Sequence, residues 1–213
     1  MLRVQPIERR HVHATADLVA RAMDVDAAYR YLFTEGTERY AGLVRLFDRN
    51  LRIHLSRRCT YVALDSQDRV VGTATVRSPS FVPISTLTML RRGLIPFAWR
   101  HGRDATRRLF WLKSTYDALE QDLAGHAPHW YVHMMAVQPE QQGRGVGSEL
   151  LARALSLAAG DDRNEKMVLT THIPKNVVFY ERARFETAWE RTIDPPGGTP
   201  YSVWGMTRHT AAT

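Results

Sequence analysis

Cysteine is almost absent from this chain, whose 213 residues include only Cys59. One cysteine forms no internal disulfide and supplies no multi-cysteine zinc site, so we expect neither, and no metal. The chain also lacks the ~18 consecutive apolar residues of a membrane span, and its first residues lack the apolar middle region of a secretory signal. We therefore expect a cytoplasmic protein without a membrane partner.

Lysine is scarce as well, because the 29 basic residues comprise 26 arginines and 3 lysines. The net charge of +7 would suit a nucleic-acid partner if it were spread over the molecule. However, residues 126–213 hold nine basic and nine acidic side chains, and residues 91–113 hold seven basic and one acidic. Arg100, Arg103 and Arg107 recur there at helical spacing. We do not expect a nucleic-acid partner, and we favour a solvated helix face over a patch that selects an acidic substrate or contacts a phosphate.

Apolar periodicity predicts strands that alternate with helices, which is typical of an α/β layered sheet in one domain. The predicted strands are 2–7, 60–64, 70–76, 130–137, 167–172, 184–193 and 201–208. The predicted helices are 14–23, 37–57, 102–123, 145–159 and 176–182. Residues 26–33 are expected to connect two helices, and residues 78–99 give no assignable pattern.

A glycine-rich turn follows the strand 130–137, where Gly143, Gly145 and Gly147 alternate just before a helix. Glycines at such a turn leave the backbone N–H groups unshielded at a helix N-terminus, where the helix dipole favours an anion. The turn lacks the Gly-Lys-Ser/Thr of a Walker loop and the spacing of a dinucleotide fingerprint. A phosphate or pyrophosphate is therefore the expected ligand.

Two motifs together resemble the GCN5-related N-acetyltransferase (GNAT) family. They are Val137-x-Pro139-x-x-Gln142-x-x-Gly145-x-Gly147 and, further along, Asn176-x-x-Phe179-Tyr180-Glu181-Arg182-x-x-Phe185. These motifs are most similar to those of family members that act on small molecules, such as puromycin N-acetyltransferase. The resemblance covers residues 129–208 most strongly.

The resemblance implies an α/β (α+β) fold with a mixed, mostly antiparallel sheet of about seven strands flanked by helices. The sheet would splay between the two strands that hold acetyl-CoA. It also implies one GNAT domain over residues 1–213. Residues 1–128, with a helical insertion at 78–128, would form the acceptor-side half, and residues 129–208 the acetyl-CoA-binding half. Dimers are common in the family, so a homodimer is also expected.

The same resemblance assigns roles to the C-terminal residues. The strand backbone of Met135, Ala136 and Val137 would bind the thioester and pantetheine of acetyl-CoA, with Asn176 on the pantetheine arm. The turn would bind the pyrophosphate through Gln142, Gly143, Arg144, Gly145, Val146, Gly147 and Ser148. Tyr180 would be the general acid for the departing thiolate. Arg184 stands where the family usually has glycine, so we expect that turn to be built differently.

The sequence says less about the site that would bind the acetyl acceptor. Strand alternation would place Tyr131, His133 and Met135 on one side, and His133, with an ordinary pKa of about 6.5, is the first candidate for the base. His172 is the second candidate. The residues expected to line the substrate site are Tyr29, Tyr31 and Phe33. A carboxylate at Asp24 or Asp26 would favour a cationic amine if it faced that site.

The sequence thus predicts an acetyl-CoA-dependent N-acetyltransferase that transfers an acetyl group to a primary amine of a small molecule by direct attack. Two alternatives remain open. One is a protein or aminoacyl-tRNA acetyltransferase that uses the basic segment 91–113, and the other is a non-catalytic regulator that binds acyl-CoA.

Overall fold

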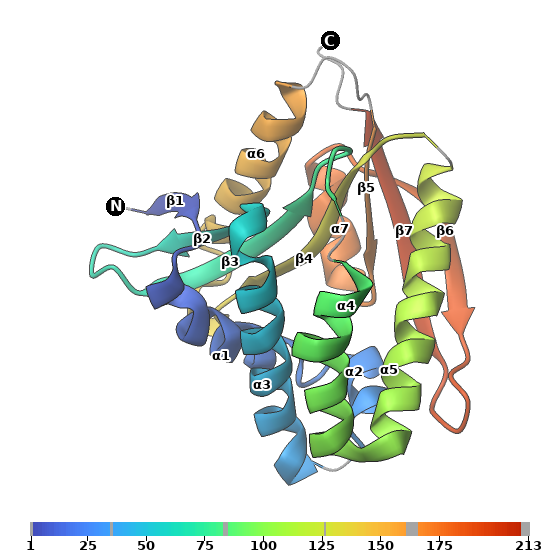
Figure 1. Ribbon diagram of the computed structural model, residues 1–213. Helices are drawn as coiled ribbons and strands as arrows, with labels where there is room; N and C mark the ends of the chain where they lie inside the picture. Colours follow the sequence, from blue (N-terminus) through green and yellow to red (C-terminus); the bar gives the residue numbers. More distant parts are fainter. Residues whose placement is uncertain (1, 35, 83–84, 126, 161–165, 210–213) are drawn as a thin grey trace.

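A seven-stranded sheet in the order β1-β2-β3-β4-β5-β7-β6 forms the centre of the computed structural model (Figure 1). Residues 2–34, 36–82, 85–125, 127–160 and 166–209 are described. The strands are β1 (Arg3–Pro6), β2 (Thr60–Leu64), β3 (Val70–Arg77), β4 (Trp130–Val137), β5 (Lys166–Thr171), β6 (Glu186–Ile193) and β7 (Tyr201–His209). Every neighbouring pair is antiparallel except β4 and β5, which are parallel. The predicted mixed, mostly antiparallel sheet is confirmed.

Helices cover both faces of this sheet (Figure 1). They are α1 (Val12–Met23), α2 (Ala27–Leu32), α3 (Gly36–His54), α4 (Thr86–Met89), α5 (Ile95–Ala124), α6 (Val146–Ala159) and α7 (Pro174–Arg182). One apolar cluster joins α1, α2, α3 and α5 to the sheet, and a second joins α6 and α7 to its other face. None of the described helices has the length and apolar character needed to cross a lipid bilayer.

Two segments differ from the prediction. The expected connection at 26–33 contains α2, which begins directly after Asp26 because the Asp26 side chain caps the helix by accepting a hydrogen bond from the Ala28 amide at 2.9 Å. In α5, Gly102 has φ 77° and ψ −179°, which interrupts the helix. Arg100 therefore lies before the interruption, and the predicted helix face of Arg100, Arg103 and Arg107 is not continuous.

A β-bulge changes the faces of β4. Thr75 of β3 is opposite Met134, and Val76 is opposite Val132, so His133 is an extra residue between two paired positions. The ring centroids of Tyr131 and His133 lie 5.7 Å apart on the α5 side. Met135 packs in the cluster of α6 and α7. The predicted common face of Tyr131, His133 and Met135 is therefore wrong for Met135.

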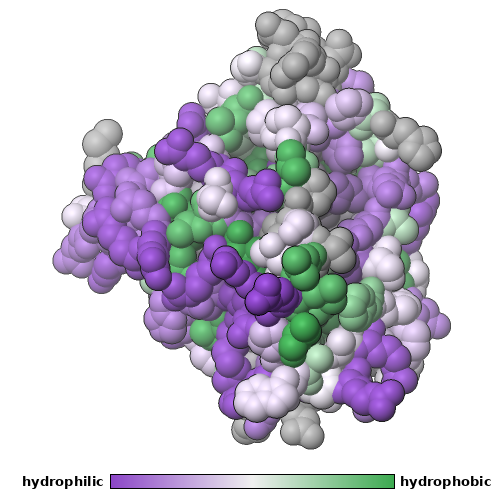
Figure 2. Space-filling model, viewed as in Figure 1, coloured by the Kyte–Doolittle hydropathy of each residue, from purple (hydrophilic) through white to green (hydrophobic). Residues whose placement is uncertain are grey.

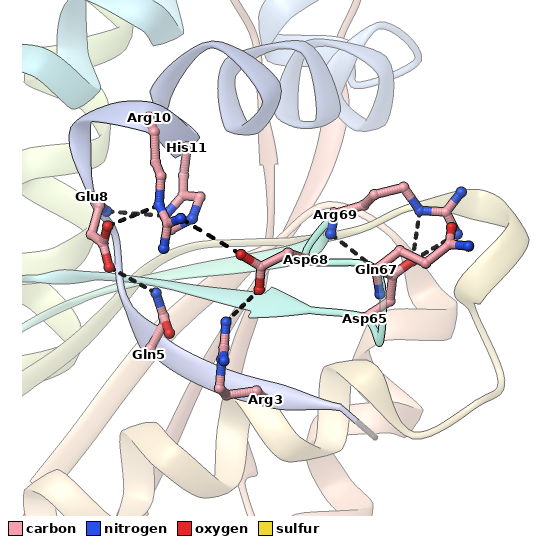
Figure 3. Close-up of polar contacts among 9 residues, drawn as sticks. All are labelled: Arg3, Gln5, Glu8, Arg10, His11, Asp65, Gln67, Asp68 and Arg69. Atoms are coloured by element: carbon pink, nitrogen blue, oxygen red, sulfur yellow. Dashed lines mark hydrogen bonds and ion pairs between the residues drawn. The ribbon is translucent and has the colours of Figure 1, made fainter.

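Ion pairs link the N-terminal segment to the β2–β3 turn (Figure 3). Arg3 pairs with Asp68, and Arg10 lies 3.6 Å from Asp68 and 2.9 Å from Glu8. Asp65 stabilises the turn by accepting a hydrogen bond from the Arg69 amide at 3.0 Å. The paired side chains of Arg3, Arg10, Glu8 and Asp68 are about half exposed, so these pairs contribute little stability compared with the buried face of α1.

The turn between α7 and β6 depends on Arg184, whose φ is +62°. Glycine adopts this left-handed conformation freely, whereas a residue with a Cβ pays about 1–2 kcal/mol. Arg184 therefore adopts the backbone conformation that suits glycine, and the prediction of a differently built turn is not supported. The exposed Arg184 side chain also lowers the pKa of Arg208, after the larger effect of burial of Arg208.

Replacement of Arg184 by glycine should stabilise the protein. The loss of left-handed strain, offset by the extra freedom of glycine in the unfolded chain, gives a gain of about 0.5–1 kcal/mol. Urea denaturation measures the change. Arg182→Gly is the matched control, because Arg182 is an exposed residue at the end of α7 and glycine should destabilise that helix. A less stable Arg184→Gly variant would contradict the strain argument.

Candidate active site

The parallel strands β4 and β5 pair over only two rows, Trp130 with Met167 and Tyr131 with Val168. Beyond Tyr131, β4 continues to Val137 while still paired on its other edge with β3. In the part of the chain that the structure describes, no strand pairs with the β5-side edge of β4 after Tyr131. Backbone N–H and C=O groups along this edge can therefore bind an extended ligand that carries amide groups.

The edge of β4 leads directly into the glycine turn. Gly143 has φ 76° and Gly145 has φ 84°, and a Cβ built on either residue would meet no described atom within 4 Å. Gly145 is the N-cap of α6, and no described side chain caps this helix. The first amides of the 14-residue helix are therefore free to bind an anion.

Local contacts fix the turn beside the sheet. The Gln142 side-chain amide donates to the Val137 carbonyl at 3.4 Å, which brings the turn back onto the end of β4. A Cβ at Gly72 of β3 would lie 2.8 Å from Val146, so glycine lets the start of α6 approach the sheet closely. The exposed cradle and the unpaired strand edge fit the pyrophosphate and the amide-bearing arm of acetyl-CoA.

Asn176 and Tyr180 lie on α7, next to the end of β5. The Asn176 side-chain amide donates to the Thr171 hydroxyl at 3.2 Å, which holds it against the last residue of the strand. Tyr180 is only 7% exposed and packs between Phe179 and Phe185, with ring centroids 5.1 Å and 5.6 Å away. Burial, followed by the nearby Tyr131, raises the pKa of Tyr180 above its ordinary value. Its hydroxyl therefore stays protonated at neutral pH.

His133 belongs to a cluster of aromatic and charged groups on the other face. The Arg77 guanidinium carbon lies 4.7 Å from the centre of the Tyr131 ring, and Arg77 pairs with Glu120. Glu120 also accepts a hydrogen bond from His129 at 3.2 Å, which raises the pKa of His129. The His133 side chain is exposed, and the groups around it remove part of its hydration. This desolvation, helped by the Arg77 charge, lowers the pKa of His133 to about 4.

The lowered pKa predicts how His133 titrates. A histidine with a pKa of about 4 gains its proton only as the pH falls through 4, so His133 stays neutral from pH 5 to 8. Nuclear magnetic resonance of the imidazole nitrogens against pH should show this midpoint, with His133→Gln identifying the signal. Arg77→Gln should raise the midpoint because it removes a nearby positive charge. A wild-type midpoint at 6 or above would contradict the prediction.

A second polar cluster joins four distant parts of the chain. His172, directly after β5, has its Nδ1 atom 2.6 Å from Asp26 Oδ2 and its Nε2 atom 2.6 Å from the Tyr116 hydroxyl. The Tyr116 hydroxyl lies 3.1 Å from that of Tyr201. The sequence identified His172 and Asp26 as separate candidates, but it gave no signal that Tyr116 and Tyr201 join them. Among the described residues, no group of three or more His, Cys, Asp and Glu side chains could hold a metal ion.

The three predicted substrate residues have different surroundings. Tyr31 is buried with its ring 5.4 Å from Trp111, and Phe33 is buried with its ring 5.9 Å from Phe97, so both rings serve core packing. Tyr29 is half-buried, and its pKa is raised by burial and then by Asp26 and Tyr131. Burial raises the pKa of Tyr201, and Asp26 and Tyr31 contribute smaller effects, so Tyr31 as well as Tyr29 lies near the polar cluster.

These features define a class of α/β protein in which a separating parallel strand pair leads into an anion-binding helix terminus. A family model described as "Acetyltransferase (GNAT) family" matches residues 26–185. The match covers most of the chain, so the protein belongs to the GNAT acetyltransferase family, whose members are transferases that use acetyl-CoA.

Solved structures share the fold at low sequence identity. The C-terminal condensation domain of Ebony in complex with β-alanyl-dopamine has a TM-score of 0.71 and 12% identity, over 98% of this chain and 99% of that one. For the Drosophila melanogaster polyamine N-acetyltransferase the TM-score is 0.64 and the identity 13%, over 98% and 100%. For a Sinorhizobium meliloti phosphinothricin acetyltransferase in complex with AcCoA they are 0.59 and 13%, over 99% and 89%.

Proposed function

We propose that this protein is an acetyl-CoA-dependent N-acetyltransferase that acetylates a primary amine of a small molecule by direct attack. One observation carries the proposal: the unpaired edge of β4 runs straight into an open glycine cradle at the N-terminus of α6. A strand edge followed by an anion site matches a long ligand with amide groups at one end and a pyrophosphate at the other.

The binding roles follow from this arrangement. The backbone of Met135, Ala136 and Val137 would bind the thioester and pantetheine, with Asn176 beside them. The amides of residues 143–148 would bind the pyrophosphate, and Gln142 would hold the turn in place. Acetyl-CoA supplies the acetyl group as an activated thioester. A strand N–H directed at the thioester oxygen would stabilise the developing negative charge by a few kcal/mol.

Tyr180 is proposed as the general acid. Its raised pKa keeps the phenol protonated, and a thiolate leaving group needs that proton when the carbon–sulfur bond breaks. The phenol has no hydrogen-bond partner among the described residues, so it is available to a substrate. This role separates an enzyme from a regulator, because binding of acyl-CoA alone requires no acid.

The proposed acceptor is a small amine. Half-buried Tyr29, Tyr116 and Tyr201 lie near Asp26, and aromatic rings with a carboxylate favour a cationic group. The β-alanyl-dopamine bound to the Ebony domain and the polyamine in the name of the Drosophila enzyme support this class. The half-domain division at residues 128 and 129, a cytoplasmic location and a homodimer remain predictions that accompany the proposal.

Release of free CoA from acetyl-CoA tests the function. A panel of alkylamines, arylalkylamines, polyamines, aminoglycosides, amino acids and peptides should contain an amine that raises CoA release far above hydrolysis. Mass spectrometry of that product should show one added acetyl group. Acetyl-CoA binding without turnover on any amine would support the regulator instead.

Removal of the Tyr180 hydroxyl should slow chemistry and leave binding intact. Tyr180→Phe keeps the ring that packs between Phe179 and Phe185, so the fold and the affinity for acetyl-CoA should be unchanged. Loss of the acid should lower kcat by about 10²-fold or more. Steady-state kinetics and isothermal titration with acetyl-CoA measure the two effects. Unchanged kcat would remove Tyr180 from the mechanism.

A side chain at Gly145 should block the anion cradle. Gly145→Val should abolish acetyl-CoA binding in calorimetric titration, because the new side chain would occupy space that the ligand needs. Gly197→Val is the matched control. Gly197 also has a positive φ, of 71°, and open space around its Cβ, but it lies in the β6–β7 connection. Normal acetyl-CoA binding by Gly145→Val would contradict the assignment of the cradle.

A macromolecular acceptor remains the second candidate because of one surface feature. Trp99 is 88% exposed, and large apolar side chains near it are also exposed: Leu87, Leu90 and Ile95. Figure 2 shows apolar side chains over α4 and the segment after it. Arg91, Arg92 and Arg100 are exposed beside them. If the acceptor is an aminoacyl-tRNA or an acidic protein, its affinity should fall steeply as the salt concentration rises, whereas the affinity for a small amine should change far less.

A further inference from the structure

Asp26, His172, Tyr116 and Tyr201 form a line of hydrogen bonds, and the direction in which these bonds donate follows from the Asp26 end. Asp26 Oδ1 accepts from the backbone amides of Ala28 at 2.9 Å and Tyr29 at 3.4 Å, which leaves Oδ2 for His172 Nδ1. Because a carboxylate only accepts hydrogen bonds, Nδ1 carries a proton, and when the ring holds only that proton Nε2 is an acceptor. Tyr116 therefore donates to Nε2.

The next link continues in the same direction. Once the Tyr116 proton points at His172, the Tyr116 oxygen can only accept from Tyr201, whose hydroxyl lies 3.1 Å away. Every proton in the line thus points toward Asp26. The Tyr201 oxygen is the open end, and its lone pairs can accept a hydrogen bond from a further donor. A line with this direction can accept a proton at Tyr201 and pass a proton on to His172.

The line also lies on the face of the sheet opposite Tyr180. His172 directly follows β5, at the end where β4 and β5 have separated. Tyr29, Tyr116 and Tyr201 all pack against the core cluster that joins α1, α2, α3 and α5 to the sheet. Tyr180 packs in the cluster on the opposite face. A thioester held between the strands would have the acid on one side and this line on the other.

We propose that this line removes the proton that a cationic amine must lose before it attacks the thioester. The inference rests on the proposed function and deepens it, since it names the class of acceptor as an amine that arrives protonated. Tyr201 is the group that touches the substrate. Tyr116 and His172 relay the proton, and Asp26 positions and stabilises His172.

The proton transfers balance as follows. An ammonium N–H gives its proton to Tyr201, Tyr201 gives its own to Tyr116, and Tyr116 gives its own to Nε2 of His172. The products are a neutral amine, two neutral tyrosines and an imidazolium paired with the Asp26 carboxylate. The amine lone pair forms the N–C bond, and the C–S bond breaks with its electron pair on sulfur. Tyr180 protonates the sulfur and regains a proton from the second N–H, and His172 releases its proton to water.

The pKa of the substrate gives a sharp test. A primary alkylamine is protonated at pH 7 and needs the line, whereas an arylamine or a hydrazide with a pKa below about 5 is already neutral and does not. Tyr201→Phe and Tyr116→Phe should lower kcat/KM for the alkylamine by about 10²-fold at pH 7. The loss should shrink as the pH approaches 10. Activity on the neutral nucleophile should stay within a few-fold of wild type.

Tyr40→Phe is the matched control for these variants. The Tyr40 hydroxyl also hydrogen-bonds a carboxylate, that of Asp17, but it connects α3 to α1 away from β5. It should leave both reactions unchanged. Equal losses on both nucleophiles in Tyr201→Phe and Tyr116→Phe would mean that the line only supports the fold. No loss on either nucleophile would overturn the proposal, and both results would leave the proposed acetyltransferase standing.

Asp26→Asn tests the direction of the line without an assay of activity. Asparagine is also a good N-cap, so α2 should form, but its amide would donate to His172 Nδ1 and move the imidazole proton to Nε2. Nitrogen chemical shifts should show the Nδ1–H tautomer in wild type and the Nε2–H tautomer in the variant. An Nε2–H tautomer in wild type would overturn the line even if amine acetylation is confirmed. If the wild-type protein acetylates no amine, the proposed function fails instead.

Discussion

The structure depends on the short parallel pairing of β4 and β5. Two paired rows, Trp130 with Met167 and Tyr131 with Val168, hold the two halves of the sheet together, and β4 stays paired with β3 along its length. A strand that keeps one partner and loses the other is rigid but has unsatisfied backbone groups, which cost free energy unless water or a ligand binds them. β4 therefore joins the two halves of the sheet, and its unpaired edge is the reason that a ligand site exists.

The bulge at His133 determines which side chains of β4 lie on each face of the sheet. With regular alternation, His133 and Met135 would share a face, and Met135 would approach the acceptor side. The extra residue directs Met135 into the cluster of α6 and α7 and leaves His133 beside Tyr131 and Arg77. Desolvation by these neighbours, followed by the Arg77 charge, lowers the pKa of His133 to about 4, which makes it a weak proton acceptor at neutral pH. The pattern of β4 therefore argues for a base elsewhere.

Local patterns in the sequence predicted the strands from 60 to 76 and from 130 to 208 because turn residues and apolar alternation occur within each element. The helix α2 was missed because its six residues lack a full apolar repeat and its start depends on the Asp26 side chain. The glycine turn was predictable because its chemistry lies in consecutive residues. The line from Asp26 to Tyr201 was not predictable, because its successive members are 146, 56 and 85 positions apart and only the packing of α2 and α5 on the sheet brings them together.

The two proton-handling groups occupy opposite faces of one sheet, and this separation explains how both can work at one pH. Burial among apolar side chains raises the pKa of Tyr180 and keeps it protonated. On the other face, Asp26 gives His172 a fixed carboxylate that stabilises an imidazolium when one forms. If the acid and the base lay on one face, a direct hydrogen bond between them would make the acid a poorer proton donor to the thiolate and the base a poorer proton acceptor for the amine. The strands between them prevent that contact, while their separation beyond Tyr131 leaves both groups beside the same backbone edge.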